Sequence, residues 1–148
     1  MPSTFLSLHY HLVFSTKDRV PLISSEWRDR LHDYLGGTVR GLDGFVEAIG
    51  GVADHVHLMV GLKATHCLAD VMRELKKASS VWVHKQVGHG AFSWQEGYAA
   101  FTVSATAIDA VTKYIDNQKE HHRVKSFREE MMEMLKMAGI PYDSKYLE

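Results

Sequence analysis

The stretch DHVHLMV, residues 54–60, carries two histidines inside an otherwise apolar run. Its alternation predicts a strand, in which successive side chains point to opposite sides, so His55 and His57 share one side, opposite Val56. Two imidazoles therefore stand side by side, and neutral imidazole is a common ligand of divalent metals. A His-x-His pair alone is equally typical of polar residues on a solvent-exposed sheet face, so a third donor has to be found.

The segments around this stretch alternate between strand and helix patterns. Together with 54–60, the periodicity predicts strands at 5–15, 45–51 and 98–104, and helices at about 24–41 and 67–86. The resulting order, β-α-β-β-α-β, is that of an α+β, ferredoxin-like split-βαβ sandwich, an antiparallel sheet with two helices on one face. This core takes up about residues 5–104.

Two more helices are predicted after the core. The first covers about 105–121, and the second covers about 126–138 and ends before Gly139 and Pro141, a common stop signal. Because no repeat or interdomain linker interrupts the pattern, residues 1–148 are expected to form a single domain.

The expected topology decides which strand residues meet the core helices. The first and third strands lie next to each other in a split-βαβ sheet, and both core helices cover the same face. Apolar residues that alternate along these strands should face the helices. The opposite, uncovered face then carries four histidines: His9, His11, His55 and His57.

Composition narrows the class of protein. The 148 residues are 45% hydrophobic and 24% charged, with a formal net charge of −1, so contact with a nucleic acid would need a local basic patch. A single cysteine, Cys67, excludes an internal disulfide and fits a reducing compartment. The N-terminal MPSTFLSLHYH lacks the pattern of a signal peptide, and no run approaches 18 apolar residues. We expect a cytoplasmic protein without a membrane partner.

The best candidate for a third metal donor lies in KYIDNQKEHHR, residues 113–123. Tyr114 and Gln118 are four residues apart and share a helix face. If this helix crosses the open face of the sheet, the amide oxygen of Gln118 completes a donor set with His55 and His57, and Tyr114 lies beside the same ion. Tyr and Gln at such an edge are also consistent with ordinary boundary packing.

Several motifs in this order resemble a known family. DHVHLMV, Tyr114 with Gln118 in YIDNQ, and the segments YHLVFSTKDR, WQEGYAAFTVS and AGIPYDSKYL together resemble the single-tyrosine HUH transposases of small bacterial insertion sequences. These are the insertion-sequence-200 type and its relatives associated with repetitive extragenic palindromes. The resemblance spans nearly the whole chain.

The resemblance implies an activity and its residues. A Mg²⁺ or Mn²⁺ ion would be held by His55, His57 and Gln118, and Tyr114 would cleave single-stranded DNA through a 5′-phosphotyrosine intermediate. Such proteins work as homodimers that recognise hairpins at element ends. Whether the tyrosine acts in its own or in the neighbouring subunit stays open.

Three further residues are candidates for supporting roles around this site. Asp54 can accept a hydrogen bond from a metal-binding histidine, although an acidic residue is also common in turns. His11 can line the DNA path or, together with His9, enlarge a metal site. His122 can assist proton transfer or touch phosphate, or it can simply be exposed at a helix end.

Basic residues give candidate contacts to the DNA backbone. Lys17 and Arg19 follow the first strand, and Arg73, Lys76 and Lys77 lie on the second helix. The alternative is that these charges are merely solvated, since acidic residues interrupt the basic face of that helix.

Three functions are compatible with the sequence. The first is a metal-dependent tyrosine transposase, and the second is a ferredoxin-like protein that binds hairpin DNA or RNA without cutting it. The third is a metal-dependent nuclease or structural zinc protein that uses the four histidines His9, His11, His55 and His57. Tyr114 discriminates the first from the second, and Gln118 discriminates the first from the third.

Overall fold

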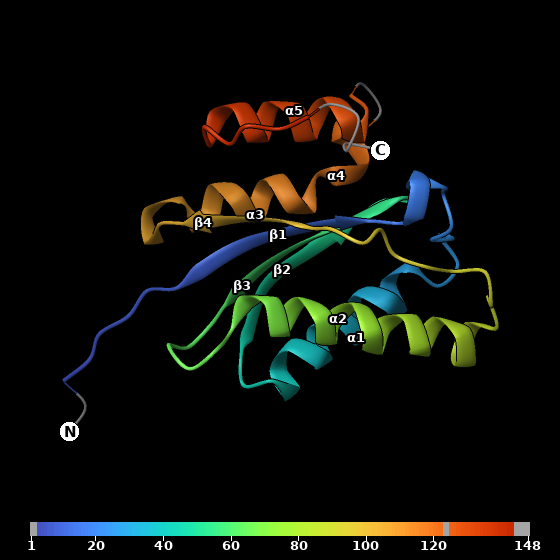
Figure 1. Cartoon of the computed structure of the whole chain (residues 1–148), viewed down its shortest axis with the longest axis horizontal. Coiled ribbons are helices and arrows are strands. Elements are labelled where there is room, and N and C mark those ends of the chain that lie inside the picture. The colour runs from blue at the N-terminus through green and yellow to red at the C-terminus, as the bar shows by residue number, and fades with distance from the viewer. Residues whose placement is uncertain (1–2, 123–124, 144–148) are drawn as a thin grey trace.

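A four-stranded antiparallel sheet runs through the centre of the computed structural model, which describes residues 3–122 and 125–143 (Figure 1). The strands β1 (His9–Ser15), β2 (Phe45–Gly51), β3 (His55–Gly61) and β4 (Ala99–Val103) lie in the order β2-β3-β1-β4. This is the expected split-βαβ order, with β1 beside β3. The end of the AGIPYDSKYL motif, from residue 144 onward, lies outside the described residues.

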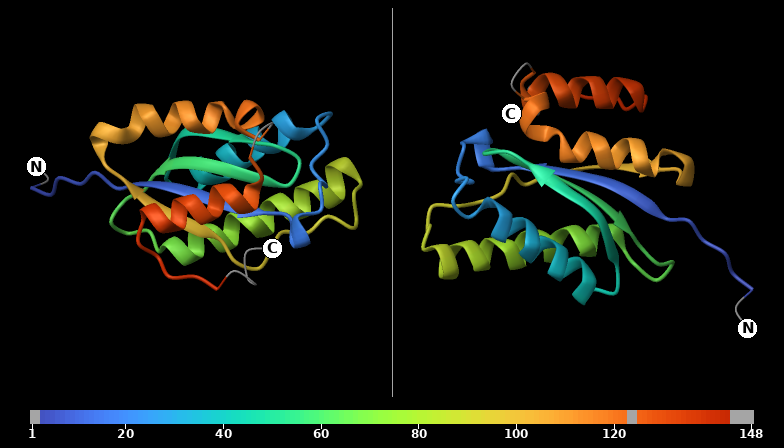
Figure 2. Two further views of the ribbon diagram at one scale, coloured as in Figure 1. Left: turned by 90° about the horizontal axis from the view of Figure 1, so that it is seen from above. Right: turned by 180° about the vertical axis from the view of Figure 1, so that it is seen from behind.

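Helices cover both faces of the sheet (Figure 2). On one face lie α1 (Arg28–Gly41) and α2 (Leu68–Trp82), which a π-helical turn, Val83–Val87, extends. On the other lie α3 (Ile108–Asp116), α4 (Gln118–His121) and α5 (Phe127–Met137). The predicted α+β ferredoxin-like class is confirmed; of the two predicted C-terminal helices, the first is divided into α3 and α4, and the second is α5. None of the described helices has the length and apolar character needed to span a bilayer.

The helix predicted over 105–121 differs most from the structure. It is divided into a 3-10 turn, Ala105–Ala107, followed by α3 and α4, with a break at Asn117, where φ is −97° and ψ is 17°. Asparagine is a weak helix former because its side chain competes for backbone hydrogen bonds. Because of this break, Tyr114 lies on α3 and Gln118 lies on α4.

The main core lies between the sheet and the helices α1 and α2. Leu12 and Phe14 from β1 and Leu58 from β3 are buried there, as alternation along the strands predicted. They pack against Leu31 of α1 and Leu75 of α2. Burial of apolar area stabilises by about 25 cal/mol per Å², so this layer provides most of the driving force for folding.

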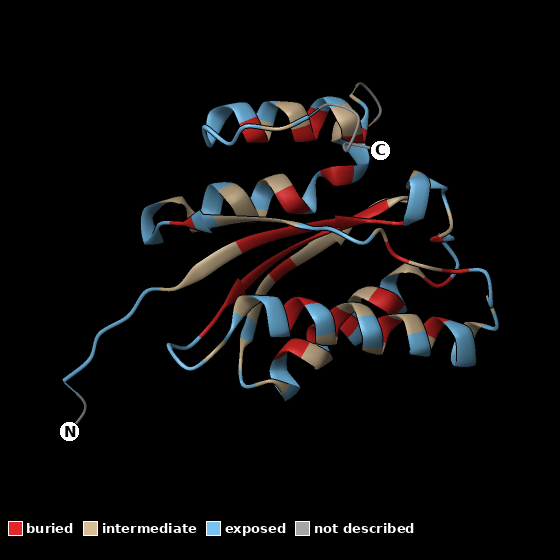
Figure 3. Cartoon of the chain, in the orientation of Figure 1, coloured by how far each residue is buried: buried red, intermediate tan, exposed pale blue. Residues whose placement is uncertain are grey.

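The histidine-bearing face is covered, which corrects the expectation of an open face. His55 and His57 are both 0% exposed. Figure 3 shows the central strands as buried between the helix layers. The same face carries apolar side chains such as Val13 and Met59, and an apolar surface of this kind is stabilised by a covering layer. Ile115 of α3 supplies part of this cover. Three side chains of α5 supply the rest: Phe127, Met131 and Leu135.

Gly50 allows α3 to approach the sheet closely. A Cβ atom built at Gly50 would lie 2.2 Å from the carbonyl oxygen of Ile115, a distance that real Cβ atoms do not tolerate. The end of α3 therefore rests directly on the backbone of β2. Ile115 lies next to Tyr114 in the chain and three residues before Gln118, so this contact fixes the height of both above the sheet.

We expect Gly50→Ala to push α3 away from β2 and to lower the free energy of unfolding by about 2–3 kcal/mol, the range for overpacking at a rigid contact. Urea unfolding measures the change. Gly37→Ala on α1 is the matched control, because a Cβ there meets nothing within 4 Å; it should change stability by no more than about 1 kcal/mol. Equal stability of the two variants would contradict the close approach.

Candidate active site

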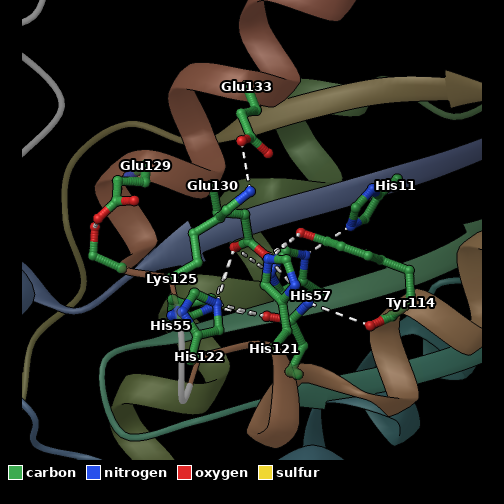
Figure 4. A network of polar contacts seen from close by, with 12 residues as sticks. His11, His55, His57, Tyr114, His121, His122, Lys125, Glu129, Glu130 and Glu133 are labelled. Carbon is green, nitrogen blue, oxygen red and sulfur yellow. Dashed lines mark hydrogen bonds and ion pairs between the residues drawn. The ribbon is translucent and has the colours of Figure 1, made fainter.

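Polar side chains from four elements meet on the covered face of the sheet (Figure 4). β3 contributes His55 and His57, α3 contributes Tyr114, and α5 contributes Glu130. Gln118 begins α4, and His122 follows its last residue. The predicted residues His55, His57, Tyr114 and Gln118 are therefore brought together within one protomer.

Each strand histidine is oriented by a neighbour through its Nδ1 atom. Nδ1 of His55 lies 2.7 Å from Oδ1 of Asp54. Nδ1 of His57 lies 2.7 Å from Nε2 of His11. The two residues are diagonal neighbours on adjacent strands, because β1 and β3 pair Val13 with His57 and His11 with Met59. Both Nε2 atoms consequently point into the cluster. Asp54 and His11 occupy supporting positions one step outside it.

The amide of Gln118 has a fixed orientation. Its Nε2 donates to Oε2 of Glu130 at 3.2 Å, which leaves the oxygen facing the imidazoles. Oε1 of Gln118 lies 3.1 Å from Nε2 of His55 and 3.0 Å from Nε2 of His122. The amide oxygen therefore faces the same space as the ring nitrogens, as the prediction of an oxygen donor requires.

Glu130 is the residue that the sequence interpretation missed. Its carboxylate is 1% exposed, and Oε1 lies 3.1 Å from Nε2 of His57 and 3.2 Å from Nε2 of His122. Burial alone would raise the pKa of this carboxyl, but the hydrogen bonds of His122, His57 and Tyr114 hold it well below its usual range. Glu130 lies between Phe127 and Met131 in the sequence, and all three belong to the inward face of α5. An acidic residue on the apolar face of a predicted helix could have indicated this role.

Tyr114 lies at the edge of the cluster, half-buried. Its hydroxyl donates to Oε2 of Glu130, and its ring centroid lies 5.8 Å from that of His57. Burial and the negative charge of Glu130 both raise the pKa of this phenol. The isolated protein thus holds Tyr114 in its neutral form, with the hydroxyl directed at the cluster.

The chemistry of the donor set fits a divalent cation. Because Nδ1 of His55 lies against the carboxylate of Asp54, its Nε2 faces the oxygens of Gln118 and Glu130. Burial lowers the pKa of His57 to about 4 and that of His11 to about 3, so both rings are neutral near pH 7. Neutral ring nitrogens and oxygens that converge in this way can serve together as ligands of a cation.

His9 and the basic residues of α2 lie apart from this cluster. Nδ1 of His9 lies 3.0 Å from Oε1 of Glu47, and His9 does not join the other histidines. Arg73, Lys76 and Lys77 belong to the helix layer on the opposite face of the sheet.

Two of these α2 side chains already have partners within the protein. The ammonium group of Lys76 donates to the carbonyl oxygens of Gln95, Glu96 and Gly97. Arg73 pairs with Asp70 at 2.9 Å. Lys76 therefore clamps the loop before β4 to α2, a role that the sequence did not suggest.

A basic cavity of about 390 Å³ opens beside the cluster. Asp54 and His122 line it, together with Arg19, Lys119 and Lys125. Arg19 ends the 3-10 turn Lys17–Arg19 and has a positive φ, as does Asp18. Of the predicted basic residues, Arg19 is thus the one that the fold brings next to the histidines. The two lysines belong to the basic run KEHHRVK, residues 119–125, and this run could have indicated them from the sequence.

Comparison with known proteins identifies relatives of the chain. A family model described as "Transposase IS200 like" matches residues 4–118. The ISDra2 transposase TnpA of Deinococcus radiodurans is 29% identical, with 76% of this chain and 85% of that protein covered.

Two solved structures share the fold. A transposase structure from Deinococcus radiodurans superposes with a TM-score of 0.66 at 28% identity, covering 80% of this chain and 95% of that one. A REP-associated tyrosine transposase bound to a REP hairpin has a TM-score of 0.57 at 14% identity, covering 78% and 68%, and supports the fold alone. Because the family model spans well over half of its residues, this chain belongs to the IS200-like transposase family.

Proposed function

We propose that this transposase cleaves and rejoins single-stranded DNA, with Tyr114 as the nucleophile beside a divalent cation held by His55, His57 and Gln118. The observation that carries the proposal is the convergence of the Tyr114 hydroxyl, the two imidazole nitrogens and the Gln118 oxygen on one buried acceptor-rich centre. Each group is presented by a rigid element, which is the condition for positioning a reacting phosphate.

The proposed step exchanges one phosphate ester for another. The oxygen of Tyr114 bonds to phosphorus, the bond from phosphorus to O3′ breaks, and the phenol loses a proton while O3′ takes one up. The products are a 5′-phosphotyrosine and a free 3′-OH, so an incoming 3′-OH can reverse the step and rejoin strands. A bound Mg²⁺ or Mn²⁺ supplies Lewis-acid stabilisation of charge on the phosphoryl oxygens.

The site is complete within one protomer, which supports action of Tyr114 in its own subunit. Its hydroxyl and the ring of His57 lie on the same chain, with α3 resting on β2 at Gly50. A homodimer, as the family resemblance implies, is then compatible with two independent sites. Hairpin DNA as the substrate is what the family resemblance implies, and a protein that shares this fold was solved with a REP hairpin.

The basic cavity is the proposed path of the DNA backbone. Arg19 and Lys119 place positive charge beside His122, and Lys125, which also pairs with Glu133, lines the same cavity. Within the described part of the chain, the buried Nε of Arg19 has no hydrogen-bond partner. A phosphate in the cavity would satisfy this nitrogen and be adjacent to the reaction centre.

A specific observation also favours the alternative of a non-cleaving hairpin-binding protein. The hydroxyl of Tyr114 is already bonded to the carboxylate of Glu130, and the raised pKa keeps it protonated. A phenol in this state is a poor nucleophile. Cleavage thus requires that cation and substrate weaken this contact, and the first experiment below distinguishes the two functions.

Tyr114→Phe should abolish the covalent protein–DNA adduct because it removes the attacking oxygen, while binding of a hairpin oligonucleotide changes less than about threefold. Denaturing electrophoresis of a labelled hairpin substrate incubated with Mn²⁺ measures adduct formation. Tyr34→Phe, on α1 at the opposite face of the sheet, is the control and should retain the adduct. Cleavage by Tyr114→Phe at the wild-type rate would indicate a nuclease that uses water, and absence of adduct in the wild type would favour the binding protein.

Arg19→Ala and Lys119→Ala should each weaken the binding of single-stranded DNA. Each should also reduce the steepness of log K against log salt concentration, by about 0.7 for each phosphate that the variant no longer neutralises. Fluorescence anisotropy over a range of salt concentrations measures this slope. Arg73→Ala provides the comparison, since Arg73 lies on the other face and pairs with Asp70. A larger decrease in affinity for Arg73→Ala than for Arg19→Ala would place the DNA along α2 instead.

A further inference from the structure

The carboxylate of Glu130 lies among ring nitrogens that point to a common centre, and the proposed donor set does not use it. We infer that Glu130 and His122 are direct ligands of the cation, so that three imidazoles and one carboxylate hold it together with the Gln118 oxygen. The inference rests on the proposed function of the cluster as a metal centre. It adds α5 to the site and specifies the kind of metal.

The distances match those between ligands of one ion. Oε1 of Glu130 lies 3.1 Å from Nε2 of His57, 3.2 Å from Nε2 of His122 and 3.6 Å from Nε2 of His55. Two ligands that are each about 2.1 Å from an ion, at right angles, are about 3.0 Å apart. One ligand atom from each of these four residues lies within 4.8 Å of the others.

The other contacts of Glu130 orient its carboxylate toward this centre. Oε2 accepts from the hydroxyl of Tyr114 and from the amide of Gln118, which leaves Oε1 facing the three ring nitrogens. Met131 and Phe127 beside it are buried against the sheet, so the helix backbone is held in place. The Glu130 side chain is 1% exposed. Burying its negative charge costs free energy unless a cation or several hydrogen-bond donors compensate for the lost water.

Glu133 on the same helix serves as an internal comparison. It lies three residues after Glu130, is 59% exposed and pairs with Lys125 at the surface. The two side chains carry the same charge on the same helix, but only Glu130 reaches the histidines. Neutralising Glu133 therefore reproduces the change in charge without changing the ligand set.

The ligand set determines the preferred metal. Mg²⁺ prefers oxygen ligands and retains several waters, whereas imidazole suits metals such as Zn²⁺, and the affinity of a site with nitrogen ligands rises from Mn²⁺ to Co²⁺. A centre with three imidazoles should therefore bind Mn²⁺ and Co²⁺ much more tightly than Mg²⁺. This narrows the choice between Mg²⁺ and Mn²⁺ that the family resemblance leaves open.

The test measures metal binding by the full chain without DNA. Calorimetric titration with Mn²⁺ should show at least tenfold weaker binding for Glu130→Gln and for His122→Ala, and wild-type binding for Glu133→Gln. The visible absorption of bound Co²⁺ should change in Glu130→Gln. Mg²⁺ should bind at least tenfold more weakly than Mn²⁺ to the wild type.

A second variant separates a ligand from a residue that only supports the fold. Glu130→His replaces one ligand with another and should recover Co²⁺ binding relative to Glu130→Gln, with a shifted absorption spectrum. Circular dichroism without metal identifies any variant that does not fold. If Glu130→His folds but binds Co²⁺ no better than Glu130→Gln, Glu130 acts as a structural ion-pair partner and the inference is wrong.

Two outcomes separate this inference from the proposed function. Wild-type Mn²⁺ binding by Glu130→Gln and His122→Ala, with adduct formation by the wild type intact, overturns the inference alone. Weakened Mn²⁺ binding in both variants without any adduct in the wild type supports the inference and rejects the tyrosine chemistry.

Discussion

The polar centre of this protein depends on ring nitrogens and oxygens that converge between the sheet and the C-terminal helices. Asp54 and His11 hold the outer nitrogens of the two strand histidines, so the inner nitrogens of both rings face the oxygens of Gln118 and Glu130. In a low-dielectric interior such acceptors repel one another unless a cation or a shared proton lies between them. The helices α3, α4 and α5 supply this interior, because they cover a sheet face that would otherwise be hydrated.

The two faces of the sheet differ in what covers them and in the side chains that they carry. One face packs against α1 and α2 and provides the main core, and the loop before β4 is clamped there by Lys76. The other has a thinner apolar layer, which leaves room for a polar centre. Gly50 allows α3 to lie close to the backbone of β2. The break at Asn117 changes the direction of the chain, so that Gln118 and His122 face the polar centre.

Local patterns in the sequence predicted the split-βαβ order, the adjacency of β1 and β3, and the shared side of His55 and His57, because these follow from strand alternation and topology. The four-residue spacing of Tyr114 and Gln118 predicted a shared face of one continuous helix; both side chains do contact Glu130, but from two segments that are divided at Asn117. The sequence did not predict the role of Glu130, since its meeting with His57 joins residues 73 positions apart and depends on how α5 packs. Nor did it predict that Lys76 binds three carbonyls, because loop conformation is not encoded in helix periodicity.

The proposed chemistry requires that one buried centre binds the cation and presents it to Tyr114 of the same chain. Anomalous diffraction at the manganese edge, from crystals soaked in Mn²⁺, tests this most directly. We expect a single strong peak within about 2.0–2.3 Å of the ring nitrogens of His55 and His57 and of a Glu130 oxygen, with the Tyr114 side chain of that protomer beside it. A peak that lacks His55 and His57 as ligands, or one whose neighbouring tyrosine comes from another subunit, would contradict the account.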